Sequence, residues 1–156
     1  MNLSGLDIRY IVAILFTVLA LFASYIYFAS PPSLSGFATE NASILYTNGT
    51  RINGSIYLAS TLSQQEQGYM YQKNIGNCNG SKNLCIGMLF VFSPGAYVCM
   101  WMKNTEIPLK QAWIGSNMLV SAVYSGVPYS TYAVCNTSSY VLETQLPINA
   151  SDRIIT

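Results

Sequence analysis

The chain has 156 residues, of which 51% are hydrophobic and only 8% are charged, and its formal net charge is +1. This length fits one compact domain once a targeting segment is set aside. The sequence has no basic patch and no glycine-rich phosphate loop, which argues against nucleic-acid and nucleotide binding. It also contains no histidine. With its cysteines oxidised, the chain therefore cannot assemble a Ser-His or Cys-His nucleophile.

Residues 10–29 form an uncharged segment close to the N-terminus. A helix of this length spans roughly 30 Å, the thickness of the hydrocarbon core of a bilayer. The sequence therefore predicts a retained transmembrane helix over 10–29, in contact with membrane lipid. Two alternatives remain open. One is a signal peptide with a loose A-x-A-like site at Phe28-Ala-Ser30, and the other is an archaeal pilin-type leader cleaved at Ser4-Gly5.

The charges that flank this helix predict its orientation. Arg9 and the terminal amine precede it, whereas the next basic residue on the other side is Arg51. By the positive-inside rule, residues 1–9 lie in the cytoplasm, and the C-terminal portion lies outside the cell. We expect a linker over 30–41 and an extracellular domain over 42–156, which makes the chain a single-pass protein of the cell membrane.

Six Asn-x-Ser/Thr sequons lie in the predicted exterior portion, several of them on Asn-Gly dipeptides. A glycosylated exterior explains this number better than chance does, so we expect N-linked glycans. A polar surface with few charges also suits an acidic exterior, where carboxylates are protonated. On composition alone, we favour a thermoacidophilic archaeon as the source. The sequons begin at Asn41, Asn48, Asn53, Asn79, Asn136 and Asn149.

All four cysteines lie in the predicted exterior domain. An even number in an oxidising compartment predicts two disulfides, for which three pairings are possible. We expect Cys78–Cys85, which closes a short loop and contributes about 2.5 kcal/mol, and Cys99–Cys135, which closes a longer loop and contributes about 4 kcal/mol. No CxxC pair is present, and core packing explains the methionines better than a Cu(I) site does. The prediction therefore includes no metal and no cofactor.

Turn chemistry predicts two hairpins. β-Favouring runs at 42–47 and 51–59 flank Asn48-Gly49, and Asn-Gly between two such runs is the strongest short-range hairpin signal. Runs at 109–114 and 118–124 are expected to pair in the same way around a polar turn.

One short helix is expected between the first hairpin and the centre of the domain. A capping box at Thr61-Leu-Ser-Gln64, or an alternative one from Ser63 to Glu66, begins a helix over 62–70. The residues after it, 74–83, form a loop that its cysteines hold. The residues that this helix is expected to present to the core are Leu62, Tyr69 and Met70.

The centre of the domain is predicted to be a hairpin of two apolar strands, 86–92 and 97–103, around Ser93-Pro-Gly-Ala96. In this register Phe90 faces Cys99. Because both faces of the hairpin are apolar, it should be central and covered on both sides. Many short strands and one short helix predict a mainly β (α+β) domain, a compact antiparallel β-barrel or clip-like sheet. The last strands are expected at 140–144 and 153–156.

Four segments stand out in chain order: Gly68-Tyr-Met-Tyr71, Gly87-Met-Leu-Phe-Val-Phe92, Trp101-Met-Lys-Asn-Thr-Glu-Ile-Pro-Leu109 and Tyr140-Val-Leu-Glu143 with Ser151-Asp-Arg-Ile154. Together they resemble a small bacterial and archaeal family, the domain of unknown function 192. The chain resembles this family over roughly Ile44 to Ile155, which implies the β-rich fold and leaves the activity open. The family usually has Asp after its Pro-Leu pair, and this chain has Lys110 there, so no carboxylate-dependent metal or acid-base role is expected.

The polar cluster at the start of the third segment is the candidate ligand-binding site, because donors and acceptors crowd there beside aromatic residues. The alternative is a structural turn in which the Asn and Thr side chains bond to the backbone and Lys103 pairs with Glu106. A glycosidase pair of Glu106 and Glu143 is disfavoured, since these acids lie on separate strands. The candidate site residues are Trp101, Lys103, Asn104, Thr105 and Glu106.

The sequence thus predicts a membrane-anchored, extracellular, non-catalytic binding or interaction module. It would act as a stand-alone surface protein or as an accessory subunit, with a membrane or cell-surface protein as partner. The alternative is an extracellular protein or enzyme that takes a sugar or small ligand at the corner formed by residues 103–106. The missing histidine and the few acids favour the first interpretation.

Overall fold

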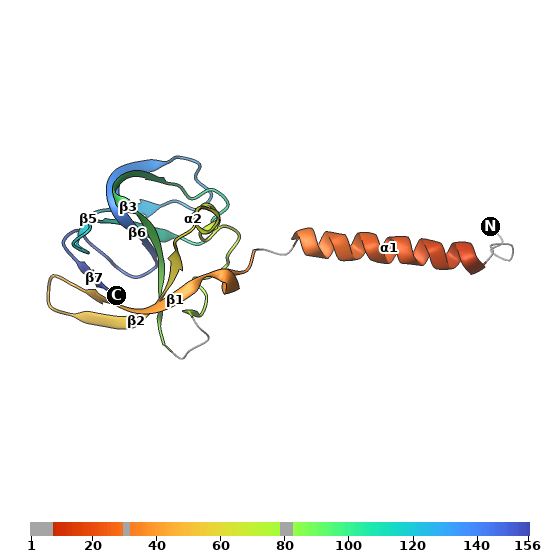
Figure 1. The fold of residues 1–156 in the computed structure, drawn as a ribbon, viewed down its shortest axis with the longest axis horizontal. Coiled ribbons are helices and arrows are strands. Elements are labelled where there is room, and N and C mark those ends of the chain that lie inside the picture. The colour runs from red at the N-terminus through yellow and green to blue at the C-terminus, as the bar shows by residue number, and fades with distance from the viewer. Residues whose placement is uncertain (1–7, 30–31, 79–82) are drawn as a thin grey trace. The chain divides into compact units, whose positions relative to one another are not determined.

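The computed structural model describes residues 8–29, 32–78 and 83–156. The chain divides into two units, Met1–Pro31 and Pro32–Thr156. The first unit contains helix α1, Ile8–Ala29 (Figure 1). Its segment Ile8–Ile26 has a mean hydropathy of 2.0, and its residues are not buried against other parts of the chain. The segment is long and apolar enough to cross a membrane as an anchor or to serve as a signal sequence.

The second unit, here called the β-domain, is a curved sheet with one short α-helix (Figure 1). The strand order is β5-β4-β6-β3-β2-β1-β7. A bridge between Leu119 and Arg153 and a bond from Val120 N to Asp152 O (2.9 Å) connect the two outer strands at one end, which makes the sheet a half-barrel and confirms the predicted fold class. The elements are η1 Leu34–Gly36, β1 Ala38–Leu45, β2 Arg51–Ala59, α2 Leu62–Gln67, β3 Cys85–Met100, β4 Leu109–Ile114, β5 Val120–Gly126, β6 Val134–Thr144 and β7 Arg153–Ile155.

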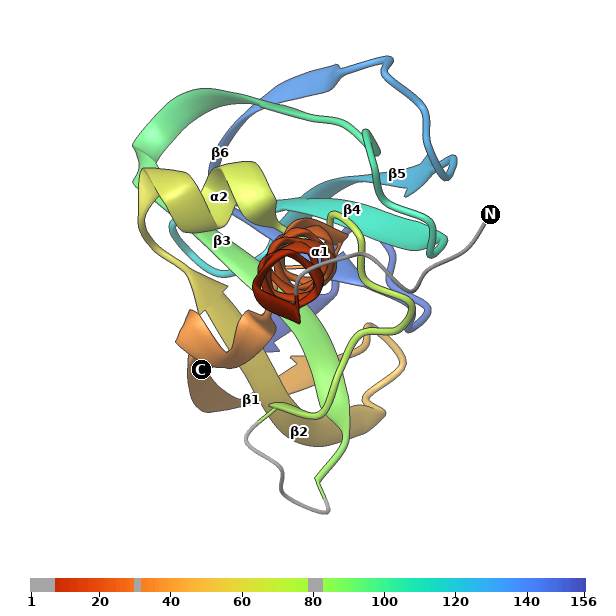
Figure 2. The same ribbon diagram turned by 90° about the vertical axis from the view of Figure 1, so that its right-hand side faces the viewer.

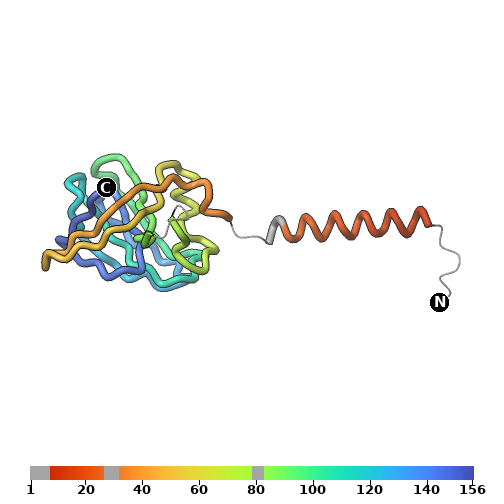
Figure 3. Tube along the Cα trace, turned by 90° about the horizontal axis from the view of Figure 1, so that it is seen from below, coloured from red at the N-terminus to blue at the C-terminus, as the bar shows by residue number. Residues whose placement is uncertain are grey.

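Both hairpins predicted from turn chemistry are confirmed. Strands β1 and β2 pair around Asn48-Gly49, and Gly49 adopts the left-handed φ of 85° that this turn needs. The path of this hairpin is clear in Figure 3, where it runs from orange to yellow. Strands β4 and β5 also pair. The linker expected over 30–41 is shorter than predicted, because Ala38 already pairs with Leu58.

Strand β3 runs without a break through the segment Ser93-Pro-Gly-Ala96, so the hairpin predicted there is wrong. Both halves of β3 pair with β6 instead of with each other. Phe90 lies opposite Val141, and Cys99 lies opposite Cys135. The residues that resemble a turn form an irregularity at which the pairing register shifts. Strand β6 is long enough to pair on both sides of it, so the extra residues are accommodated as a bulge.

One strand pair differs from the antiparallel pattern that was expected. Strand β2 runs parallel to β3, with Tyr57 opposite Met88. A parallel pair requires a crossover between its strands, and the segment containing α2 supplies it. As a result, α2 lies against the sheet next to β3, where Gln65 Nε2 donates to the Val91 carbonyl at 2.7 Å.

Two apolar clusters cover the two faces of the sheet. One has members from all seven strands, which a curved sheet brings together on its concave face. The other contains more residues from outside the strands, including Leu34, Tyr69 and Met102. Met88 and Phe90 lie in the second cluster and Leu89 lies in the first, so β3 is covered on both sides as predicted.

Helix α2 has the capping box predicted at residues 61–64. It ends at Gln67, earlier than expected, because Gly68 adopts a φ of 44° and leaves the helix. Tyr69 is buried as predicted, but Leu62 is 72% exposed and does not face the core. The position on α2 that faces the sheet is Gln65, whose amide bonds to β3.

The two predicted disulfides are both present. Cys78 bonds to Cys85, and Cys99 bonds to Cys135 across strands β3 and β6. No cysteine of the chain is left as a free thiol.

Candidate functional site

A cleft opens between α2 and β3, which lie against each other in Figure 2. It has an inner cavity of about 60 Å³, roughly the space of two water molecules. An adjoining outer recess of about 260 Å³ is mostly apolar. Phe90, Met100 and Trp101 line both parts. We call the two parts together the α2–β3 cleft.

All four segments that carry the family resemblance contribute to the inner cavity. They are far apart in the chain, and the sheet brings them together because β3 pairs with β6 while α2 packs on β3. The convergence identifies this cavity, rather than the polar corner alone, as the candidate site. The residues from these segments that line it are Gly68, Tyr69, Met70, Phe90, Trp101, Thr105 and Glu143.

Glu143 is the buried acid among the residues that line the cavity, and its side chain is only 4% exposed. Its Oε1 accepts a hydrogen bond from Gln111 Nε2 at 2.9 Å. In the described part of the chain, Oε2 has no hydrogen-bond partner. Burial raises the pKa of Glu143 from 4.5 to about 7, and the bond from Gln111 offsets only part of this rise. Strongly shifted carboxyl groups in clefts are typical of functional sites.

Two neighbours fix the surroundings of this carboxyl group. Gln111 is fully buried, and its Nε2 also donates to the Trp101 carbonyl at 3.3 Å, so one amide holds both the acid and the wall of the cavity. The second neighbour, Tyr69, is also buried and lines the same cavity. Burial, followed by the proximity of Glu143 and of Tyr57, raises the pKa of Tyr69 well above its ordinary value, so its hydroxyl stays neutral.

The raised pKa of Glu143 predicts a pH-dependent loss of stability. The folded carboxyl holds its proton up to about pH 7, whereas the unfolded one loses it near 4.5. The free energy of unfolding should therefore fall as the pH rises from 4.5 to 7, by about 3 kcal/mol. Glu143→Gln keeps the acceptor for Gln111 without the charge. It should abolish this fall and stabilise the protein at pH 8 by about 2–3 kcal/mol.

Chemical unfolding of the full chain in a maltoside detergent, followed by tryptophan fluorescence at pH 4.5 and pH 8, measures this effect. Wild type and Glu143→Gln should differ at pH 8 and converge at pH 4.5. Equal pH profiles for the two proteins would show that Glu143 is ionised at no cost to folding, which would contradict the buried position described here.

Some of the predicted site residues at positions 101–106 line the cleft, and the others connect neighbouring segments of the chain. Trp101 and Thr105 line the inner cavity. The Lys103 ammonium lies 5.0 Å from the centroid of the Trp101 ring, within the range of a cation–π contact. The structure thus brings two of the predicted residues to the cleft and places Lys103 on the ring of one of them.

The other two predicted residues connect neighbouring segments. Asn104 adopts a φ of 55°, and its Nδ2 donates to the Tyr71 hydroxyl at 2.7 Å. Its carbonyl accepts the Tyr71 N–H, also at 2.7 Å. Glu106 accepts the hydroxyl of Tyr129 at 3.0 Å. Asn104 therefore connects the turn after α2 to the corner.

Of the structural-turn alternative, the structure shows the bond from a Thr side chain to the backbone, since Thr105 Oγ1 donates to the Lys103 carbonyl at 3.3 Å. Lys103 and Glu106 contact Trp101 and Tyr129, respectively.

Sequence reasoning missed the role of Glu143, which it considered only as one half of a glycosidase pair with Glu106. Glu106 does not line the cavity, so the two acids do not form a common site. The available signal was an acid at the end of an otherwise apolar strand, Tyr140-Val-Leu-Glu143. Among the described residues, no group of three His, Cys, Asp or Glu side chains is close enough to hold a metal ion.

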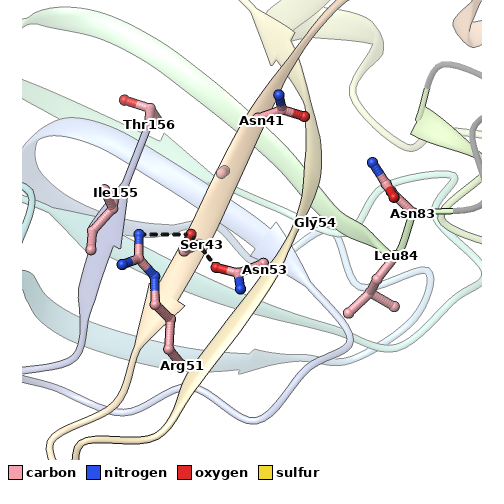
Figure 4. Close-up of a pocket in the computed structure, with 10 residues that line it drawn as sticks. Asn41, Ser43, Arg51, Asn53, Gly54, Asn83, Leu84, Ile155 and Thr156 are labelled. Carbon is pink, nitrogen blue, oxygen red and sulfur yellow. Dashed lines mark hydrogen bonds between the residues drawn. The ribbon is translucent and has the colours of Figure 1, made fainter.

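A second, shallow groove of about 650 Å³ lies over β1, β2 and the end of β7 (Figure 4). Its lining is more polar than apolar and includes residues of two sequons that lie opposite each other on the paired strands β1 and β2. The antiparallel register puts Asn41 opposite Ser55 and Asn53 opposite Ser43. Ser43 Oγ donates to Asn53 Oδ1 at 2.8 Å and accepts a bond from Arg51 at 3.2 Å.

The other sequons occupy different positions. Asn48 is exposed at the tip of the β1–β2 hairpin, and Asn149 is exposed in the turn before β7. Asn136 is half-buried on β6. Asn79 lies outside the described residues. Glycosylation at these positions stays a prediction.

Comparison with known proteins places this chain among uncharacterised relatives. The DUF192 family, described as an uncharacterized ACR, matches residues 44–151. None of the curated proteins compared with the chain matches it. One similar solved structure is that of a candidate transcription regulator from Sinorhizobium meliloti, with 29% identity, a TM-score of 0.66, and coverage of 76% of this chain and 94% of that one. Another is a protein of unknown function from Novosphingobium aromaticivorans, with 25% identity, a TM-score of 0.66, and coverage of 81% and 91%.

Proposed function

The chain belongs to the domain of unknown function 192 family, and we propose that it is a membrane-tethered, extracellular binding module that holds a partner at the α2–β3 cleft without catalysis. The observation that carries this proposal is the convergence of all four family segments on one cavity with a buried carboxyl group. Ligand sites are typically apolar concavities with a few polar groups, and the cleft has this composition.

The tether and the location are inferred from the helix and the disulfides together. Helix α1 is apolar and unburied over a length that spans a bilayer. Two disulfides are typical of a domain in an oxidising compartment. Arg9, on the N-terminal side of the apolar run, supports a cytoplasmic N-terminus and an exterior β-domain. N-linked glycans on the exposed sequons would then cover the surface away from the cleft.

Two chemical features favour binding over catalysis. The chain has no histidine, and its four cysteines are all in disulfides, so the common nucleophile–base pairs cannot form. The regulator name of the Sinorhizobium protein does not carry over to this chain, because a net charge of +1 provides little attraction for phosphates. The sugar-binding or enzymatic alternative at residues 103–106 is weaker, since Asn104 and Glu106 are used to connect neighbouring segments.

Affinity purification from native membranes tests the proposed function. Trp101 lines the cleft and is 44% exposed, so Trp101→Ala should leave the fold intact and reduce the amount of co-purified partner at least tenfold. Lys103→Ala, which removes the ammonium on that ring, should reduce it as well. Tyr97→Ala is the matched control, because Tyr97 is an exposed aromatic residue on β3 that does not line the cleft. Wild-type retention by Trp101→Ala, or the absence of any stoichiometric partner, would contradict the proposal.

Mass spectrometry of the same preparation tests the tether and the glycans. The expected result is a chain that retains α1 and carries sugar on exposed sequons such as Asn48 and Asn149. A mature N-terminus near Ser30 would exclude the anchor, and one near Leu6 would indicate pilin-like processing. Unmodified peptides at all six sequons would reject glycosylation.

A further inference from the structure

We propose that the α2–β3 cleft recognises a primary ammonium group on an apolar stem, with Glu143 as its counter-ion. The chemistry is that of a lysine side chain of a partner protein or of a free alkylamine. This inference rests on the proposed binding function and specifies the ligand of the same site.

The two parts of the cleft match the two parts of such a ligand. The inner cavity, about 60 Å³, has room for a small polar head group and not for a ring or a branched chain. The outer recess, about 260 Å³, is walled by Phe90, Phe92 and Val98 together with residues shared with the cavity. An unbranched alkyl stem gains from burial against such a wall, at about 0.8 kcal/mol for each buried CH₂.

The bonding of Glu143 leaves one oxygen for a ligand. Oε1 is occupied by Gln111, while Oε2 has no partner among the described residues and belongs to a side chain that lines the cavity. Among the described residues, the fully buried side-chain polar atoms without a partner are Gln111 Oε1 and Trp113 Nε1, so Glu143 Oε2 is not sealed off and a donor from a ligand could reach it. An ammonium group carries three N–H donors and the complementary charge, so its bond to the carboxylate would be charge-assisted.

The charges around the cavity favour a cation. The ionisable residues that line it are the acids Glu66 and Glu143 and the neutral Tyr69, and no Lys or Arg is among the lining residues. Gln111 on β4 faces Glu143 as a neutral donor. Lys103 is the nearby base and lies on the Trp101 ring, outside the lining. Phe90 and Tyr69 line the cavity, and aromatic rings attract a cation, whereas the Trp101 ring is already contacted by Lys103.

The cation should bind the ionised form of Glu143. Since burial raises the pKa of this carboxyl group to about 7, the empty site is mostly protonated at pH 6 and mostly ionised at pH 8. Affinity for an ammonium ligand should therefore rise about tenfold from pH 6 to pH 8. A neutral ligand of the same shape should show no such rise.

Titration of the full chain in maltoside micelles with n-butylammonium, a mimic of the lysine side chain, tests the proposal. The chain has two tryptophans, so indole ¹⁵N labelling gives two NMR signals. Trp101 in the cleft should shift saturably, and Trp113, which is buried and does not line the cleft, reports on the fold. We expect n-butylammonium at pH 8 to bind at least tenfold more tightly than n-butanol, and more tightly than tetramethylammonium, which has no N–H to donate.

The variants separate recognition from folding. Glu143→Gln should weaken n-butylammonium binding at least tenfold, and because it is expected to stabilise the protein at this pH, unfolding would not explain the loss. Tyr97→Ala should bind as wild type does. Equal affinity for n-butanol and n-butylammonium, unchanged affinity between pH 6 and pH 8, or wild-type binding by Glu143→Gln would each overturn the inference.

The source of the ammonium is decided in the affinity purification. If a lysine of the partner occupies the cleft, n-butylammonium should elute the partner; if the ligand is a free amine, the partner should remain bound. Loss of the partner in Trp101→Ala without any n-butylammonium binding would leave the proposed function intact and refute the ligand class. Binding of n-butylammonium with full partner retention by Trp101→Ala would refute the proposed function and leave the ligand class intact.

Discussion

Replacing Gly87 with alanine should lower the free energy of unfolding by about 4 kcal/mol or more, the largest effect expected of a single substitution in the β-domain. A Cβ at this position would overlap the Glu143 carbonyl of the neighbouring strand and lie 3.2 Å from the Thr144 Cα. These are backbone atoms, so no flexible side chain can move away. Relief requires separating β3 from β6, which pair at the centre of the sheet.

Gly36→Ala is the matched control for this substitution. No atom lies within 4 Å of a Cβ built at Gly36, so the change should alter stability by no more than about 0.5 kcal/mol. Chemical unfolding of the two variants, followed by near-UV circular dichroism, measures the difference. A Gly87→Ala protein as stable as Gly36→Ala would mean that β3 and β6 do not approach as closely as described, and the cavity that depends on this approach would also be in doubt.

Local sequence signals predicted those parts of the fold that local chemistry determines. The Asn48-Gly49 segment favours a hairpin because glycine easily adopts the left-handed φ that Gly49 has in this turn, 85°. The capping box at residues 61–64 likewise depends on neighbours in the chain. Both features are present in the structure.

The central strand was mispredicted because its pairing depends on a distant partner. Ser93-Pro-Gly-Ala96 has the composition of a turn, and two apolar runs flank it. What prevents a hairpin is β6, which pairs with both halves of β3. The predicted Cys99–Cys135 bond was consistent with this pairing, since it requires residue 99 to lie beside residue 135, which is on β6.

The site was predicted only at its rim for a similar reason. Trp101 and Thr105 stand in a polar-aromatic cluster that is visible in the sequence. The importance of Glu143 comes from burial, which arises only when α2, β3 and β4 pack around it. A carboxyl group at the end of a strand is usually exposed, so sequence alone favours a surface acid.

Removing the disulfide between β3 and β6 is the second large effect that we expect. The bond joins cysteines separated by 36 positions, and closing a loop of this length restricts the unfolded chain by about 4 kcal/mol. The double variant Cys99→Ser/Cys135→Ser should lose about this much stability. The matched control is Cys78→Ser/Cys85→Ser, which opens a loop with a separation of 7 and should lose about 2.5 kcal/mol.

The same double variant should also affect the cleft. Cys99 lines both the inner cavity and the outer recess, and Met100 and Trp101 follow it directly in the chain. Without the bond, backbone pairing and the apolar packing of Val98 and Met100 still hold the end of β3 to β6, but a covalent restraint is lost, so the wall formed by Trp101 should move more. The indole signal of Trp101 is therefore expected to broaden in Cys99→Ser/Cys135→Ser and to stay sharp in Cys78→Ser/Cys85→Ser. Equal stability losses in the two variants, with unchanged Trp101 signals, would show that the longer bond neither restricts the unfolded chain more nor orders the cleft.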